Sequence, residues 1–291
     1  MPINFNISQK EHKNLKLDMI FNCSDEILYQ IFSSHSTLKQ SDIFHLILTC
    51  RRRFYLAALP LLYRSLQFHD SLCKPRYGIP WSLMQMLCTI VAHPDRASWV
   101  QSSQFFWPAR HVELWHCIFD FLSRLSSLHD FKLVAAPDYR YDKYKHRHQP
   151  RTDGGCSLSL FIPRLVNLPL RSLDVEDIKL DIEEITDLYA FAHLKYLRIT
   201  KFHFMVSHNM ELSVDKEYPP SGLTSLEFWR APFPMGRYAK YLLKNHPFLK
   251  SLGWVIGIGS DTTPWSSQHI CEAMGPLKTT LTELHLSIID S

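Results

Sequence analysis

The chain has 291 residues, of which 46% are hydrophobic and 21% charged, a composition typical of a folded protein rather than a disordered one. Its formal net charge of +4 does not favour nucleic-acid binding, where a basic face would be expected. Seven cysteines stand without any CxxC pair, as in proteins that keep their thiols reduced. No run approaches the roughly 18 apolar residues of a membrane span, and the N-terminus lacks an apolar signal core. We therefore expect a protein of the cytoplasm or nucleus without a membrane partner.

Three short helices are predicted near the N-terminus. The first begins at Ser24, whose hydroxyl can cap the first free N–H groups, and the second begins at Ser41. The third runs from Phe54 to Leu59 and is ended or bent by Pro60. So small a module is marginal alone, because it cannot bury all its apolar surface. The pattern leaves open whether these helices dock on the rest of the chain or bind a partner helix.

Two motifs in these helices carry a family resemblance. They read Asp25-Glu26-Ile27-Leu28-x-x-Ile31-Phe32 and Asp42-Ile43-x-x-Leu46-x-Leu48-x-Cys50-Arg51-x-x-Phe54. Their spacing resembles the F-box, and the segment from Pro60 to Leu66 looks like its continuation in fungal F-box proteins. F-boxes usually open with Leu-Pro, where this chain has Cys23-Ser24. Cys23 has a smaller side chain than Leu, so we expect it to weaken binding of the partner.

The resemblance implies an adaptor subunit of an SCF-type ubiquitin ligase. Such a protein binds a Skp-type linker protein, and through it a cullin, while the rest of the chain selects a protein target. It catalyses nothing and needs no cofactor. The residues that the resemblance places at the linker are Ile27, Leu28, Ile31, Phe32, Ile43, Leu46, Leu48, Cys50 and Phe54. Two alternatives stay open, namely an F-box scaffold or regulatory protein acting outside ubiquitination and a hydrolase that uses Cys156.

A degenerate Lxx(L)x(L) pattern recurs through the remainder of the chain. Its first anchors are Val100, Leu128, Leu170, Leu194, Leu223, Leu249 and Leu281. Successive anchors lie 24 to 32 residues apart, except for one interval of 42. Most of these intervals are in or near the period of leucine-rich repeats, about 20–29 residues. Helices are predicted between the strands, at residues 82–92, 111–126 and 181–191 and after Pro234 and Pro264, whereas residues 201–221 are predicted to form an irregular loop.

The predicted fold class is α/β, with a three-helix F-box followed by an irregular leucine-rich-repeat-like solenoid whose parallel sheet is curved. We expect a disordered segment at residues 1–16, the F-box at 17–70 and the repeats at 71–291, with a basic polar insertion at 137–156. The asparagine usual in such repeats is replaced by Ile178, Phe202 and Ala231. An ordinary α/β domain with leucine-rich strands is the alternative.

The last predicted strand, Leu281 to Ser287, would leave an apolar face uncovered. Another molecule could cover that face, or the chain could be a shortened gene product, and we favour the second explanation. Outward positions on the strands are the expected place for target recognition: Lys132, Arg171, Asp174, Lys195, Arg198, Glu227, Trp229 and Lys250. Their mixed charge suits a protein or peptide target more than a phosphate backbone.

The basic insertion and two residue types were considered as chemical sites. The insertion could contact a phosphorylated peptide or nucleic acid, but a solvated, disordered segment is the favoured interpretation. His146 and His148 lack cysteines or carboxylates at structural-zinc spacing, so no metal site is predicted. Cys156 has no marked base or orienting group nearby, so no catalytic residue is assigned.

Overall fold

The computed structural model describes residues 52–68, 81–108, 112–136, 161–176, 179–180, 182–200, 203–204, 220–230, 242–244, 246–258 and 267–290. The chain divides into two compact units, residues 1–65 and 66–291, and each is described by itself. The first two predicted helices, the insertion and the three positions of the missing asparagine lie outside the described residues, as does the start of the helix expected after Pro234.

The first unit contributes one described helix, α4 (Arg52–Arg64). The prediction that Pro60 ends or bends the third helix at Leu59 was wrong about its end, because α4 continues to Arg64. Proline removes one backbone N–H donor from a helix and its ring crowds the preceding turn, a cost of the same order as the burial of one or two apolar side chains. Leu59 and Leu61, which flank Pro60, are both 8% exposed.

The second unit alternates strands with helices. Its strands are β1 (Ser65–Phe68, which begins at the unit boundary), β2 (Ser102–Pro108), β3 (Asp130–Ala136), β4 (Ser172–Glu176), β5 (Lys179–Leu180), β6 (Tyr196–Thr200), β7 (His203–Phe204), β8 (Ser225–Trp229), β9 (Ser251–Ile258) and β10 (Glu283–Asp290). Its helices are α5 (Trp81–Ala92), η2 (Pro94–Trp99), α6 (Val112–Ser123), α7 (Ile162–Leu165), α8 (Ile182–Tyr189), α10 (Ser267–Met274) and η4 (Gly275–Leu277). The helices predicted at residues 82–92, 111–126 and 181–191 are confirmed as α5, α6 and α8.

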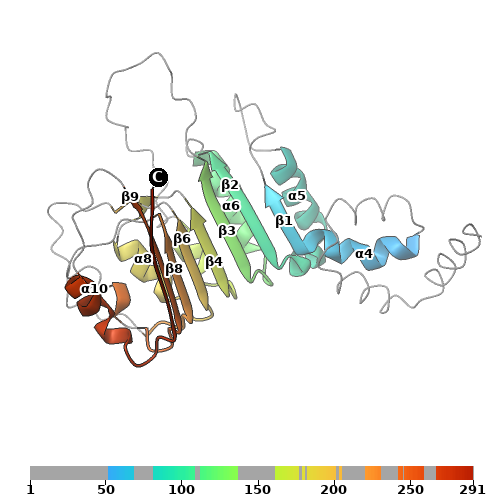
Figure 1. Cartoon of the computed structure of the whole chain (residues 1–291). Coiled ribbons are helices and arrows are strands. Elements are labelled where there is room, and N and C mark those ends of the chain that lie inside the picture. The colour runs from blue at the N-terminus through green and yellow to red at the C-terminus, as the bar shows by residue number, and fades with distance from the viewer. Residues whose placement is uncertain are drawn as a thin grey trace, which may run out of the picture. The chain divides into compact units, whose positions relative to one another are not determined.

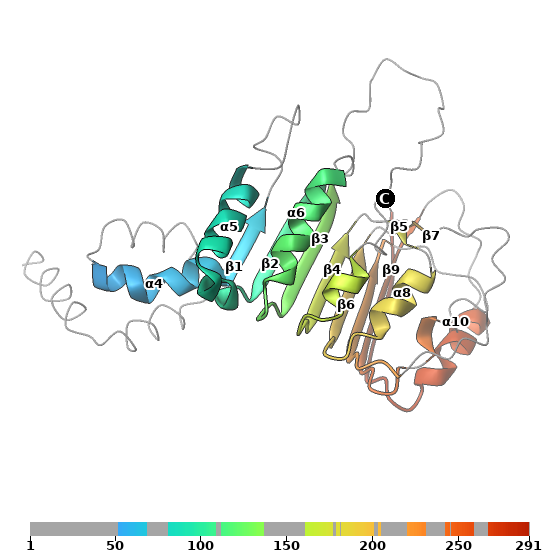
Figure 2. The ribbon, with the colours of Figure 1, turned by 180° about the vertical axis from the view of Figure 1, so that it is seen from behind.

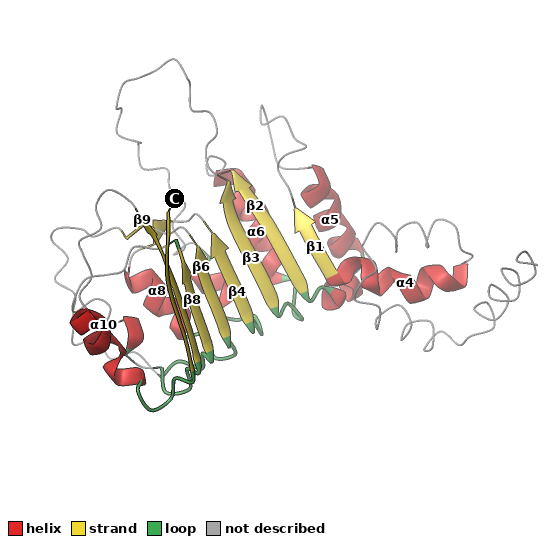
Figure 3. Ribbon diagram, viewed as in Figure 1, coloured by secondary structure: helices red, strands yellow, loops and turns green. Residues whose placement is uncertain are grey.

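Eight strands form one open sheet in the order β1-β2-β3-β4-β6-β8-β9-β10, and every pairing from β2 to β10 is parallel (Figure 1). The strand arrows, including that of β1, point the same way (Figure 3). Helices α5, α6 and α8 lie on one face of this sheet, which Figure 2 shows from the side of the helices. The prediction of an α/β fold with a parallel sheet is confirmed.

Each strand of the repeating pattern turns alternate residues toward the helices. In β4 the residues alternate between half-buried and buried, and Leu173 and Val175, on the helical side, are fully buried. The equivalent pairs Phe131 and Leu133 on β3 and Leu197 and Ile199 on β6 are at most 1% exposed. The leucine anchors therefore form a continuous core between the sheet and its helices, as a strand period of two requires.

Aromatic rings fill part of this core. The ring centroid of Phe105 lies 4.8 Å from that of Phe68 and 5.9 Å from those of Phe121 and Phe131. Farther along the sheet, the rings of Phe228 and Trp254 are 4.4 Å apart. Such pairs add stabilisation beyond their buried area, about 0.5–1.5 kcal/mol each.

The prediction of an irregular loop over residues 201–221 was wrong at its start. Residues His203 and Phe204 form β7, which pairs in parallel with β5 in a separate two-stranded sheet. Both strands are only two residues long, shorter than the four to eight residues over which a strand pattern can be recognised. The chain thus makes a second, minor pairing just beyond the ends of β4 and β6.

The last strand, β10, has its apolar side uncovered. Leu284, Leu286 and Ile288 are 49%, 37% and 65% exposed, although they are in register with the buried Leu252, Trp254 and Ile256 of β9. The expectation of an uncovered apolar face at the last strand is confirmed for these residues. Each apolar residue of β10 must therefore contribute less to the free energy of unfolding than its register partner on β9.

We predict that Leu252→Ala lowers the free energy of unfolding by about 2–5 kcal/mol, because its side chain is fully buried and would leave a cavity. Leu284→Ala is the matched control, since the two residues are directly paired in register. Because Leu284 is half exposed, its loss should cost less than about 1.5 kcal/mol. Urea unfolding measures both, and equal losses would contradict the described burial.

His246 is a buried histidine in the core of the second unit. It is 3% exposed, its Nε2 donates to the carbonyl of Leu242 at 2.8 Å, and its ring meets Tyr189 edge-on with centroids 4.3 Å apart. Its Nδ1 has no hydrogen-bond partner among the described residues. Burial lowers the pKa of His246 from 6.5 to about 4, partly offset by the bond to Leu242. The folded protein therefore holds this imidazole neutral.

The depressed pKa of His246 predicts a loss of stability in mild acid. Above pH 6.5 the ring is neutral in both states, whereas between pH 6.5 and 4 only the unfolded chain gains the proton. His246 should therefore cost roughly 2–3 kcal/mol of stability by pH 4. His246→Gln, which keeps a donor for Leu242, should show a correspondingly weaker dependence on pH in chemical unfolding. Equal pH dependence in both proteins would contradict the prediction.

Candidate recognition surface

The face of the sheet opposite α5, α6 and α8 carries a row of alternating charges. Lys132 on β3 is in register with Asp174 on β4, Asp174 with Arg198 on β6, and Arg198 with Glu227 on β8. We call these four residues the charged row. Since neighbouring strands lie about 4.8 Å apart, each charge stands next to one of opposite sign. Cross-strand pairs of this kind stabilise a sheet and hold long side chains in place.

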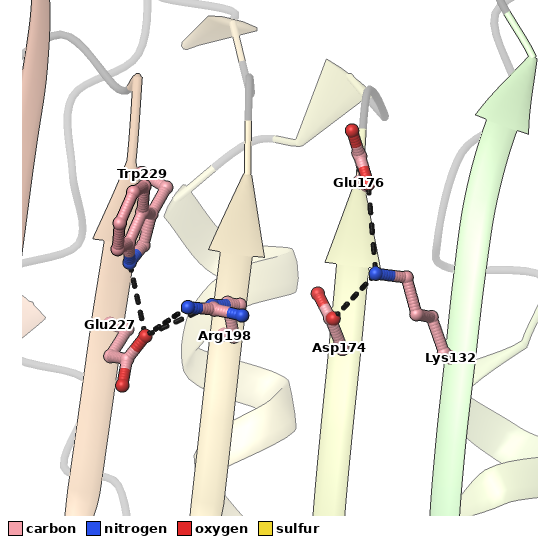
Figure 4. A network of polar contacts seen from close by, with 6 residues as sticks. All are labelled: Lys132, Asp174, Glu176, Arg198, Glu227 and Trp229. Carbon is pink, nitrogen blue, oxygen red and sulfur yellow. Dashed lines mark hydrogen bonds and ion pairs between the residues drawn. The ribbon is translucent and has the colours of Figure 1, made fainter.

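Lys132 is shared by two carboxylates. Its Nζ lies 2.9 Å from Oδ2 of Asp174 and 3.8 Å from Oε2 of Glu176 (Figure 4). The Asp174 side chain is only 16% exposed, and its Oδ1 has no hydrogen-bond partner among the described residues. The ammonium of Lys132 is therefore the main compensation for this carboxylate.

Glu227 is the centre of the second cluster. Its Oε2 accepts hydrogen bonds from Nε of Arg198 at 2.9 Å and from Nε1 of Trp229 at 3.0 Å, and it forms an ion pair with Nη2 of Arg198, also at 2.9 Å (Figure 4). The guanidinium carbon of Arg198 also lies 5.0 Å from the centre of the Trp229 ring, within the range of a cation–π contact. One carboxylate oxygen thus fixes a cation and an indole at the same time.

Two neighbours complete the surroundings of Glu227. Gly253 is its register partner on β9, and a Cβ there would come within 3.3 Å of Cγ of Glu227, so a side chain would crowd the aliphatic part of Glu227. The hydroxyl of Tyr196 donates a hydrogen bond to Glu227. Burial, together with the charge and hydrogen bond of Glu227, raises the pKa of Tyr196 to about 12, although Arg198 opposes the shift. Tyr196 therefore keeps its proton at neutral pH and acts as a hydrogen-bond donor.

The structure places the predicted target-binding residues in two groups. Lys132, Asp174, Arg198, Glu227 and Trp229 share the face described above, whereas Arg171, Lys195 and Lys250 precede their strands at one end of the sheet. Their role in target binding stays a prediction. Glu176 and Tyr196 were missed, although each stands two residues from a chosen position on its own strand and so faces the same side.

The other predicted sites fall mostly outside the described residues. Of the linker-binding set, only Phe54 is included, within α4, and nothing is described of its side chain. Residues 137–156, with His146 and His148, and Cys156 are outside as well. Within the described part of the chain, no group of three or more His, Cys, Asp or Glu side chains could hold a metal ion. None of the described helices has the length and apolarity to cross a membrane.

This surface is chemically suited to binding. Lys132 and Arg198 face three carboxylates, those of Asp174, Glu176 and Glu227, so acids outnumber cations by one among these five side chains. Donors and acceptors are held by one another across two strand pairings, β3 with β4 and β6 with β8, so a partner would meet a largely preorganised polar surface. Fixed groups of this kind reduce the entropy that must be lost on binding.

We predict a measurable coupling between Arg198 and Glu227. In a double-mutant cycle of Arg198→Met and Glu227→Leu, unfolding free energies should give a coupling of about 1 kcal/mol, because the pair is half-buried and joined by a hydrogen bond and an ion pair. The control cycle combines Glu227→Leu with Arg171→Met, which changes an exposed cation away from this carboxylate. Its coupling should be below about 0.3 kcal/mol. A coupling near zero in both cycles would contradict the described geometry.

Comparison with known proteins adds no family to this description. No protein-family model matches the chain, and no curated protein matches it either. What can be inferred about function therefore depends on the residues of this chain.

Proposed function

We propose that the protein is a substrate-recruiting adaptor of an SCF-type ubiquitin ligase. The observation that carries the proposal is the F-box-like spacing of the motif that begins at Asp25-Glu26-Ile27-Leu28 and ends at Phe54. In this proposal the motif binds a Skp-type linker protein, which connects the chain to a cullin, and the second unit holds a protein target.

The described part of the first unit is compatible with this proposal. The motif ends in Cys50-Arg51-x-x-Phe54, and the backbone of Phe54 lies in α4. A helix is what this part of an F-box requires. The motif residues that would contact the linker precede α4, so their role depends on the sequence resemblance.

The arrangement of the second unit supports the repeat half of the proposal. The first anchors Val100, Leu128, Leu170, Leu194, Leu223 and Leu249 are all at most 1% exposed, and each precedes one strand of the sheet. Backbone hydrogen bonds also join consecutive repeats: the residue just before each strand accepts N–H groups from the start of the next repeat's strand. We interpret this unit as an irregular leucine-rich-repeat-like solenoid, in which neighbouring repeats bury one another. Such folds present a long sheet surface to a protein target.

The mechanism is one of proximity. An adaptor that binds linker and target together raises the effective concentration of the target near a ubiquitin-charged enzyme, without chemistry of its own. Each apolar motif side chain that is fully buried at the linker would contribute about 1.5–3 kcal/mol before the costs of association. Acidic substitutions there should therefore abolish binding.

We predict that the natural chain co-purifies with a Skp-type linker in stoichiometric amounts and that Leu28→Asp, Phe32→Asp does not, because two charges would be buried at the interface. The matched control is Val91→Asp, Val166→Asp, which introduces the same charges at exposed apolar positions of the second unit, 55% and 43% exposed. The control should bind the linker as the natural chain does. Unchanged linker binding by the Leu28, Phe32 variant would refute the proposal.

A second measurement separates an adaptor from a scaffold that binds the linker alone. In cells, an adaptor should shorten the lifetime of at least one bound protein, and the Leu28→Asp, Phe32→Asp variant should restore that lifetime. A chain that binds the linker without changing the turnover of any protein bound to its second unit would act outside ubiquitination.

A further inference from the structure

Besides the charged row, the second unit has a row of residues at the end of the sheet where the strands begin. Each member stands just before a strand, and its backbone N–H bonds the carbonyl of the preceding member at 2.7–2.9 Å. We call it the edge row: Gln101, His129, Arg171, Lys195, Thr224, Lys250 and Thr282. These bonds place the side chains of the row one strand spacing apart, about 4.8 Å.

The cations of the edge row differ from those of the charged row in their partners. Lys132 and Arg198 are each held by carboxylates at 2.9 Å. Among the described residues, no ion pair joins Arg171, Lys195 or Lys250 to an acid, and all three are exposed. The only side-chain bond recorded for Lys195 runs from its Nζ to the carbonyl of Gly222, at 3.1 Å, which positions the ammonium without neutralising it. These positive charges are therefore open to an anion.

An open pocket lies between the two lysines. It has a volume of about 380 Å³ and is lined by Lys195, Thr224, Pro247, Phe248, Lys250 and Thr280. Phe248 is 60% exposed there, an unusual position for a large apolar ring. The pocket thus combines two cations with one apolar surface, which fits an acidic segment that also carries an apolar side chain.

The length of the cationic stretch is limited at both ends. The first residues of the strands run in register from Asp130 on β3 to Glu283 on β10, and those between them are Ser172, Tyr196, Ser225 and Ser251. Both terminal acids are exposed, so a long polyanion running along the edge would meet negative charge on either side. From Arg171 to Lys250 is three strand spacings, about 14 Å, which an extended peptide spans in four to five residues. A short acidic segment fits better than a nucleic-acid strand.

We propose that this edge, at Lys195, Lys250 and Phe248 with Arg171 beside them, binds a short acidic peptide segment of a partner protein. The biological meaning of this inference rests on the proposed function, since the partner would then be the recruited target. The peptide would place carboxylates against the lysines and an apolar side chain on Phe248. Binding would weaken with salt, because the charges are exposed.

The test selects ligands for the full-length chain from a displayed library of random peptides of about nine residues. The expected sequences are acidic, with carboxylates about three positions apart, because Lys195 and Lys250 are two strand spacings apart, and with an apolar residue between them. A selected peptide, made synthetically, should bind Lys195→Ser, Lys250→Ser roughly ten- to a hundredfold more weakly than the natural chain. Phe248→Ser should reduce the preference for an apolar residue in the selected peptides, while the preference for acidic residues should remain.

The matched control is Arg164→Ser, Arg230→Asn, which removes the same charge from exposed positions that do not line the pocket. Asn is chosen for Arg230 because this residue has a φ of 51°, which asparagine tolerates. This control should bind the peptide as the natural chain does. Circular dichroism verifies folding, and the single variants Lys195→Ser and Lys250→Ser give an intermediate loss if the double variant unfolds.

Several results would overturn the inference: no enrichment from the library, enrichment of peptides without acids, or equal losses in the pocket variant and the control. A single-stranded oligonucleotide that binds more tightly than the selected peptides and depends on the same lysines would also overturn it. None of these measurements involves the linker. The peptide site can therefore fail while linker binding succeeds, and the reverse.

Discussion

One backbone interaction sets the geometry of the whole second unit. Just before each of the strands β2, β3, β4, β6, β8 and β9, one carbonyl accepts two N–H groups, from the residue before the neighbouring strand and from that strand's first residue, at 2.7–3.1 Å. The interaction repeats at Gln101, His129, Arg171, Lys195, Thr224 and Lys250, so each new strand begins level with the one before it. A shift of one residue would turn every buried leucine toward water, so burial and this bond favour the same register. The charged row and the edge row are consequences of that fixed register.

The same constraint explains what the sequence could predict and what it could not. Anchors such as Leu173 and Leu197 recur within the same Lxx(L)x(L) pattern and are fully buried, so the strands and the helices between them were predictable. The pairing of Lys132 with both Asp174 and Glu176 was not, because it depends on which strands are neighbours and on side-chain directions. The end of the helix was predicted wrongly at Pro60, because the rule that proline ends a helix considers only the missing N–H. Leu59 and Leu61 on either side of Pro60 are buried, and α4 continues through it.

The edge at β10 shows how far the stabilisation depends on neighbours. On β9, Leu252 and Trp254 are fully buried, whereas their register partners Leu284 and Leu286 on β10 are 49% and 37% exposed. The backbone pairing of β10 with β9 extends over eight residues, so hydrogen bonds hold the strand even where burial is incomplete. Hydrogen bonding and burial therefore contribute separately to the stability of β10. Its backbone pairing with β9 is complete, whereas the burial of its apolar side chains is not.

The distribution of charge also assigns different tasks to the two polar surfaces. On the helix-free face, Lys132 and Arg198 each have a carboxylate at 2.9 Å, and acids outnumber cations by one among the side chains of these ion pairs. An anion arriving there would have to displace an existing partner and would be repelled by the surplus. At the edge, the two lysines beside Phe248 have no acid recorded against them among the described residues, so an anion would lose only its hydration. Electrostatics therefore favours an acidic segment at the edge. The helix-free face is better suited to a partner whose hydrogen-bond donors and acceptors add to the existing ion pairs.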